Sequence, residues 1–127
     1  MPQNRDSGRR ANEFGHRMAA IVAQNIGAQK LNHTGNEFRW NGKSITVRSA
    51  HRGNGYVGVL YSMLERVDLV LAALETDTPD EFQVWELDSA TYLHDAKPQV
   101  KNPFIAQTST RTFHEKGKLI AGVTDAK

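Results

Sequence analysis

Three side chains of different chemistry, Glu37, Thr46 and Arg48, are expected on one face of a β-hairpin. In the register that the turn imposes, Glu37 lies across from Thr46 and diagonal to Arg48, within reach of long side chains. A guanidinium stays protonated and can clamp a phosphate through two hydrogen bonds. Glu37 and Arg48 can equally form a cross-strand ion pair with no chemical role. The stretch 45–50 is therefore the first candidate for a site, and contact with phosphate is its first candidate chemistry.

The turn that fixes this register is Asn41-Gly42, the favoured pair for a type I′ turn, because both central residues take positive φ. Residues 37–40 and 43–48 alternate between polar and apolar on either side of it. A two-residue loop leaves one register and assigns every side chain to a face. The face opposite the candidate site is apolar and is expected to point into the core. It carries Phe38, Trp40, Ile45 and Val47.

The hairpin is flanked by elements that can position it. Apolar residues at helical spacing predict a helix from about Arg9 to Ile26. The apolar run 68–74 predicts a strand buried on both faces, and the alternating run 82–87 predicts its partner. Residues 56–67 are consistent with a short strand followed by a helical turn.

The rest of the chain has weaker patterns. Asp88 or Ser89 can cap a short helix. Residues 108–111 are expected in a mobile polar tail that could also grip phosphates, and 118–123 predict a last strand. Together the elements indicate α/β architecture with a mixed central sheet, an N-terminal helix and a β-hairpin. We expect one domain over residues 9–127, preceded by a frayed or disordered segment at 1–8.

Composition is that of an ordinary globular protein. The 127 residues suit one domain, and 39% apolar with 24% charged content argues against disorder. The sequence has no cysteine, which fits a reducing compartment. No signal-peptide pattern and no apolar run of about 18 residues is present. We therefore expect a cytoplasmic protein with no membrane contact.

The net charge of +2 is unevenly distributed. Residues 1–52 hold nine Lys/Arg against three Asp/Glu, residues 53–95 one against nine, and residues 96–127 six against two. If the two basic segments share a face, that face attracts a polyanion. The alternative is that opposite charges are interspersed over the surface. The candidate nucleic-acid contacts are Arg17, Arg39, Lys43 and Arg52, although Arg39 and Arg52 also fit solvated surface charges.

The order of helix, hairpin, connecting segment, strand pair and helix resembles the core of the PD-(D/E)XK nucleases, the restriction-endonuclease-like superfamily. Such nucleases often carry a glutamate on the first helix and an acidic residue on a hairpin strand. An apolar-acid-apolar-lysine strand and small residues follow. The residues at these places are Glu13, Glu37 and Ile45-Thr46-Val47-Arg48-Ser49-Ala50. The resemblance covers about residues 12–87 and leaves 88–127 as a C-terminal extension.

This resemblance implies a restriction-endonuclease-like fold, DNA as the partner and Mg²⁺-dependent phosphodiester hydrolysis. On this chain it makes Glu37 the metal ligand with Glu13 assisting, and Arg48 the group that stabilises phosphate charge. Thr46 replaces the expected acid with a neutral hydroxyl, which at most holds a metal-bound water. Arg48 replaces the expected lysine and cannot act as a base. The catalytic set implied by the resemblance is therefore degenerate.

Other readings stay open. The chain can be a catalytically inactive nuclease-fold module that binds nucleic acid, or a protein partner in a restriction or phage-defence system. It can also be a homodimer that associates through its acidic segment at 65–88. Glu13 can simply pair with Arg17 one helical turn later. Four aromatic residues are expected to pack in the core or at its edge rather than to stack on bases: Trp40, Tyr56, Phe82 and Trp85. The five histidines lack zinc-ligand spacing, and residues 53–55 lack the rest of a phosphate loop.

Overall fold

A six-stranded mixed sheet forms the centre of the computed structural model, which describes residues 5–31 and 36–125. Its order is β1-β2-β3-β5-β6-β9, in which β3 and β5 run parallel and the other neighbours antiparallel. The strands are β1 (Gln29–Lys30), β2 (Glu37–Trp40), β3 (Lys43–Ala50), β5 (Leu69–Glu75), β6 (Glu81–Asp88) and β9 (Lys118–Thr124). The described chain is thus mixed α/β, as the patterns indicate.

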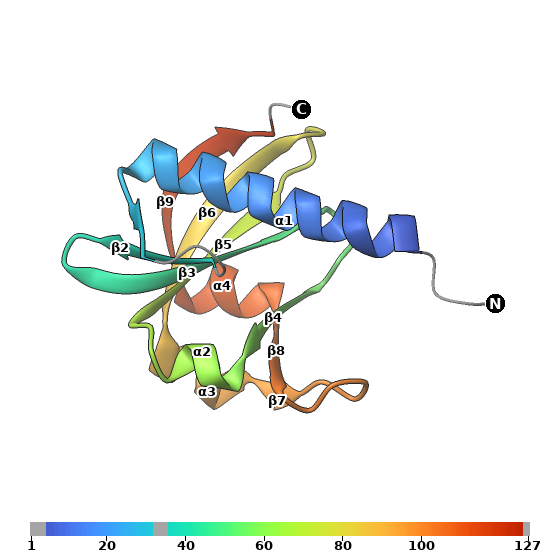
Figure 1. The fold of residues 1–127 in the computed structure, drawn as a ribbon, viewed down its shortest axis with the longest axis vertical. Helices are drawn as coiled ribbons and strands as arrows, with labels where there is room; N and C mark the ends of the chain where they lie inside the picture. The colour runs from blue at the N-terminus through green and yellow to red at the C-terminus, as the bar shows by residue number, and fades with distance from the viewer. Residues whose placement is uncertain (1–4, 32–35, 126–127) are drawn as a thin grey trace.

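One face of this sheet is covered by α1 (Arg5–Ile26), which lies across the strands in Figure 1. Met18 and Val22 on its inner side are fully buried against β3, β5 and β6. Gly27, at φ 78°, ends the helix, and the Ala28 N–H donates to the Ala23 carbonyl at 2.8 Å, as in a Schellman motif. The helix begins at Arg5 rather than near Arg9, so residues 5–8 are helical. Residues 1–4 of the expected frayed segment lie outside the described residues.

The hairpin of β2 and β3 has the predicted register. Asn41 and Gly42 take φ of 51° and 79°, as a type I′ turn requires. Glu37 pairs with Thr46, and Phe38 pairs with Ile45. The prediction that the run after Asp68 is buried on both faces is also confirmed, since six of the seven residues of β5 are buried.

The other face of the sheet is covered by a small three-stranded sheet and three short helices, at the bottom of Figure 1. The small sheet has the order β4-β8-β7, and Asp88 caps α3 as predicted, since its carboxylate accepts from the Thr91 N–H at 2.7 Å. The buried Tyr92 hydroxyl lies 2.9 Å from the Val57 carbonyl and 2.7 Å from the Ala106 carbonyl, so α3 holds β4 to β8. The elements of this layer are β4 (Tyr56–Leu60), α2 (Tyr61–Leu64), α3 (Ser89–Asp95), β7 (Lys97–Pro98), β8 (Ile105–Ser109) and α4 (Thr110–Lys116).

The expected polar tail at 108–111 is instead part of this layer. Ala106 and Thr108 of β8 point inward and are buried, and Phe113 of α4 is fully buried. The Ser109 side chain caps α4 by accepting from the Arg111 N–H at 3.1 Å. Two inward residues and one aromatic ring form too short a pattern to predict a strand and a helix from the sequence. Packed against the large sheet, the same three residues are enough to bury β8 and α4. Within the described residues, no helix has the length and apolar character needed to span a membrane.

Candidate functional site

Glu37 and Thr46 meet on the predicted face of the hairpin, but both are buried, at 8% and 1% exposure. The Glu37 carboxylate pairs with the Arg66 guanidinium, which donates to it from Nε at 3.4 Å. Arg66 follows α2 and is half-exposed. The cross-strand partner expected for Glu37 was Arg48, and the structure brings Arg66 there instead. The charge of Glu37 is therefore already balanced within the described chain.

Glu13 lies on the other side of the sheet. α1 packs on the face that carries Phe38, Ile45 and Val47, and strand alternation turns Thr46 and Arg48 to the opposite face. Glu13 is exposed on α1, and its charge is one of the causes that raise the pKa of Arg17, after the hydrogen bonds to Asp125. The structure thus brings Glu37, Thr46 and Arg48 to one face and leaves Glu13 out.

These donors do not fit Mg²⁺, which takes near-octahedral oxygen ligands and usually one or two carboxylates. The two acidic candidates are on opposite faces, Glu37 is ion-paired, and Thr46 offers a neutral, buried hydroxyl. Within the described ranges no three His, Cys, Asp or Glu side chains are grouped so that they could hold a metal ion. No catalytic step through a metal is therefore derived for this site.

Arg48 occupies a different environment, a cavity of about 730 Å³ at the carboxyl end of β3. The cavity exists because β2 begins only at Glu37, opposite Thr46, so that the last residues of β3 have no described strand on that side. α1, β4 and α2 form its walls. The cavity lies at the carboxyl end of a parallel strand, a common place for ligands in α/β proteins.

The Arg48 guanidinium is a cation with no anionic partner among residues 5–31 and 36–125. It is open to solvent through the cavity, yet protein surrounds it closely enough that loss of water lowers its pKa, with a weak opposing effect from Tyr92. Among the described residues, no hydrogen bond or ion pair is formed with the Arg48 side chain. An arginine still keeps its proton at physiological pH. A partly dehydrated, unpaired cation of this kind favours a bound anion.

The described lining of the cavity contains no aspartate or glutamate. Hydrogen-bonding groups surround Arg48, and an apolar wall faces them. Besides Arg48, the polar lining residues are Asn12, His16, Asn36, Thr46, Ser49, His51 and Asn54, and the apolar wall includes Phe14, Val59, Leu60, Met63 and Ile105. A volume of this size suits a ligand as large as one nucleotide. The arrangement can hold an anion whose remaining surface is partly apolar.

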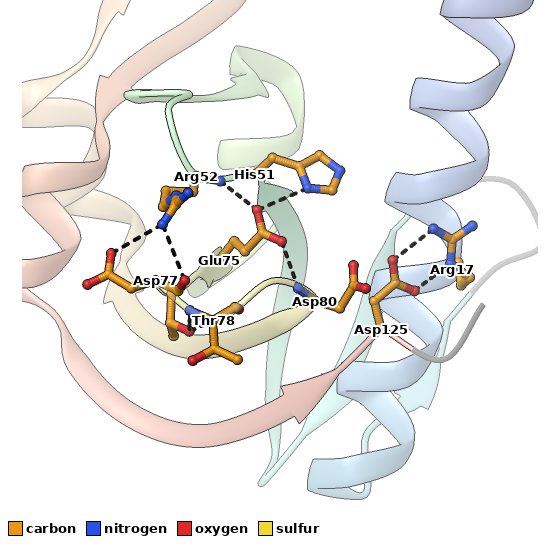
Figure 2. A network of polar contacts seen from close by, with 9 residues as sticks. Arg17, His51, Arg52, Glu75, Asp77, Thr78, Asp80 and Asp125 are labelled. Carbon is orange, nitrogen blue, oxygen red and sulfur yellow. Dashed lines mark hydrogen bonds and ion pairs between the residues drawn. The ribbon is translucent and has the colours of Figure 1, made fainter.

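One rim of the cavity is fixed by the network in Figure 2. The His51 ring stacks on Phe14 with centroids 4.0 Å apart, and its Nδ1 lies 3.3 Å from Glu75 Oε1. The Glu75 carboxylate accepts from the backbone N–H groups of Arg52 and Asp80, both at 2.9 Å. These two bonds, with His51, hold the pKa of Glu75 below its ordinary value. The loop that follows β3 is therefore anchored to the β5–β6 turn.

The four predicted nucleic-acid contacts do not gather around the cavity. Arg17 forms two hydrogen bonds with the buried Asp125 carboxylate, at 2.7 and 2.9 Å, and so joins α1 to β9 (Figure 2). The Arg52 side chain lies 3.7 Å from Asp77 and donates to its carbonyl. Arg39 and Lys43 are exposed at the hairpin end of β3, where Arg39 pairs with Ser44 and Lys43 lies roughly 17 Å from Arg48 by strand rise. Neither residue lines the cavity.

Two features of the site had no signal in the sequence. Arg66 reaches Glu37 only because the β4–α2 crossover returns the chain to the hairpin. His51 and Phe14 come from separate elements and meet only when α1 packs. A comparison with protein-family models finds no match for this chain, and comparisons with curated proteins and with solved structures find none either.

Proposed function

We propose that this chain is a nucleic-acid-binding module on a restriction-endonuclease-like scaffold, and that Arg48 binds a phosphate of the ligand. The scaffold part of the proposal is supported by α1, the β2–β3 hairpin and the parallel pairing of β3 with β5. DNA is the expected ligand and the cytoplasm the expected compartment, which the absence of cysteine fits.

The observation that carries the proposal is the contrast around Arg48. Its guanidinium is partly dehydrated, and no described carboxylate pairs with it. The described wall of its cavity offers amide, hydroxyl and imidazole groups but no acid. Phosphate supplies the missing charge and can accept two guanidinium hydrogen bonds.

The two residues that the resemblance implies near a metal, Glu37 and Thr46, do not favour phosphodiester cleavage. Glu37 is held by Arg66, and Thr46 brings no second charge. The proposal therefore assigns binding rather than Mg²⁺-dependent hydrolysis to this face. Cleavage and self-association become outcomes that the experiment below separates.

The test is fluorescence anisotropy with labelled single-stranded and duplex oligonucleotides at about 50 mM salt. We expect Arg48→Ala to weaken binding by about 10-fold or more, because it removes a charge-assisted phosphate contact. Arg52→Ala is the matched control, since Arg52 already contacts Asp77, and it should change binding by less than about 3-fold. Equal affinity of wild type and Arg48→Ala, or no binding at low salt, would contradict the proposal.

Plasmid incubation with Mg²⁺ or Mn²⁺ completes the test. We expect no cleavage by the wild type or by Glu37→Ala. Metal-dependent cleavage that Glu37→Ala abolishes would restore the hydrolytic function. Light scattering on the same samples checks for a homodimer, which a ligand-independent doubling of mass would show.

A further inference from the structure

The small sheet presents an uncovered face that continues from the Arg48 cavity. Val57 and Val59 of β4 are buried, so the alternate residues Tyr56, Gly58 and Leu60 point away from the core. Tyr56 is 57% exposed and Leu60 is 47% exposed. Tyr56 thus departs from the expectation that it packs in the core or at its edge.

This outer face is continuous with the cavity through its central residues. Gly58, Leu60 and the neighbouring Ile105 of β8 all belong to the cavity wall. A side chain at Gly58 would come within 2.9 Å of Ile105 Cγ2, so Ile105 already fills the space above the glycine. Gly58, Leu60 and Ile105 therefore lie on the face of the small sheet that carries Tyr56 and also border the Arg48 cavity.

A second aromatic ring stands at the far end of β4. Phe104 is 75% exposed, and its carbonyl accepts from the Tyr61 N–H at 2.9 Å, directly after Leu60. The backbones of Tyr56 and Phe104 therefore lie near opposite ends of β4, roughly 15 Å apart by strand rise, with Phe104 in the turn that leads into β8. Figure 1 shows β4 and β8 side by side, with the β7–β8 loop that carries Phe104 projecting from the molecule.

The strands of this layer lie in segments without acidic residues. Residues 51–64 and 96–114 contain none of the chain's 14 Asp and Glu residues, whereas α3 and α4 carry Asp95 and Glu115. Of the four cations in these segments, Arg52 contacts Asp77, and Lys97, Lys101 and Arg111 are exposed. Lys97 pairs in register with Gln107, which pairs with Gly58, so Lys97 belongs to the same face. The exposed cations beside the strands of the small sheet complement the charge of a polyanion.

We propose that single-stranded nucleic acid crosses the outer face of the small sheet, stacks bases on Tyr56 and Phe104, and places one phosphate at Arg48. This inference rests on the proposed function and adds the form of the ligand and its path. Exposed rings beside cations are the means by which proteins hold single strands without reading sequence. A duplex keeps its base faces stacked inside the helix and cannot use the rings.

The experiment compares a single-stranded DNA 12-mer, its RNA counterpart and the DNA duplex in the anisotropy assay. We expect Tyr56→Ala and Phe104→Ala each to weaken single-strand binding by about 5- to 100-fold. Tyr56→Phe keeps the ring and should stay within about 3-fold of wild type. Leu119→Ala removes a 46% exposed apolar side chain from β9, outside the proposed path, and should leave binding unchanged. The duplex should bind at least about 10-fold more weakly than the single strand.

The outcomes separate the two proposals. If Arg48→Ala weakens binding while both ring variants and the duplex match wild type, the path is wrong and the Arg48 phosphate site stands. If wild type binds no oligonucleotide, both proposals fail. The relative affinities for DNA and RNA identify which strand is preferred, and equal affinity identifies a sugar-independent site. Unchanged thermal midpoints of the ring variants show that lost binding is not lost folding.

Discussion

Glu37 and Arg48 lie on the same face of one hairpin, yet their environments are opposite. Glu37 is buried and paired with Arg66, whereas Arg48 lines an open cavity without a described ionic partner. In the sequence, Glu37 stands where the resembled motif expects an acid, and Arg48 stands where it expects a lysine. The difference in their environments comes from Arg66, which follows α2 and reaches Glu37, whereas the carboxyl end of β3 borders the cavity.

This contrast shows that a position in a sequence motif indicates where a side chain lies. It does not indicate whether the charge of that side chain is free to bind a ligand. A carboxylate neutralised by arginine is a structural group, whereas an arginine with no described ionic partner keeps its charge available to an anion. The three variants below test the contrast, first at the Glu37 end and then at the cavity.

The largest expected effect is that of Thr46→Glu, which places a second carboxylate beside Glu37 at a position only 1% exposed. We expect a loss of roughly 3 kcal/mol or more in the free energy of unfolding at pH 7, because Arg66 cannot balance two buried acids. Urea unfolding measures it, and Thr46→Gln separates added charge from added volume. Full recovery with Mn²⁺ would show that this end of β3 can hold a metal after all, and would remove the contrast.

A smaller effect is expected for Tyr92→Phe, which removes the hydroxyl that holds β4 and β8 to α3. Its loss should cost about 1 kcal/mol in unfolding free energy. Burial raises the pKa of Tyr92, so the hydroxyl stays neutral at physiological pH and does not supply charge to Arg48. Oligonucleotide affinity should therefore stay unchanged. Tyr61→Phe is the control, and a Tyr92→Phe variant that loses binding would assign part of the anion site to the hydroxyl.

The smallest effect is a pH dependence at the rim. The folded-state pKa of Glu75 lies below its ordinary value, so its ionised form stabilises the fold above about pH 4.5. That contribution is lost as pH falls through the lowered pKa. We expect Glu75→Gln to be less stable than wild type at pH 7, with the difference shrinking toward pH 3.5. Urea titrations at pH 7, 5 and 3.5 check this, with the exposed Glu81→Gln as control. A difference that grows on acidification would contradict the assignment.

Local signals predicted much of the fold. Asn41-Gly42 determines the hairpin and its register because the turn geometry and the alternation agree, and Asp88 caps α3 because its carboxylate is spaced to reach the Thr91 N–H. β8 and α4 were missed because their inward residues, chiefly Ala106 and Phe113, form too short a pattern. Their structure depends on packing against the large sheet.

The site was predicted only as far as one hairpin determines it. The shared face of Glu37, Thr46 and Arg48 follows from register, and the structure has it. The partners of these residues depend on long-range packing, which brings Arg66 to Glu37 and α1 to the rim of the Arg48 cavity. The exposure of Tyr56 depends likewise on β4 joining β8 rather than the large sheet.

The Arg17–Asp125 pair has a consequence for how the protein is made. These residues lie 108 positions apart, and α1 packs partly on β9. On the ribosome, α1 emerges before the strands that cover it, β3, β5, β6 and β9, so its apolar side stays uncovered while they are made. The nascent chain must therefore keep Met18 and Val22 from wrong contacts until these strands dock. A contact between residues so far apart in the sequence favours slow folding. We therefore expect chaperones to increase the yield of folded protein.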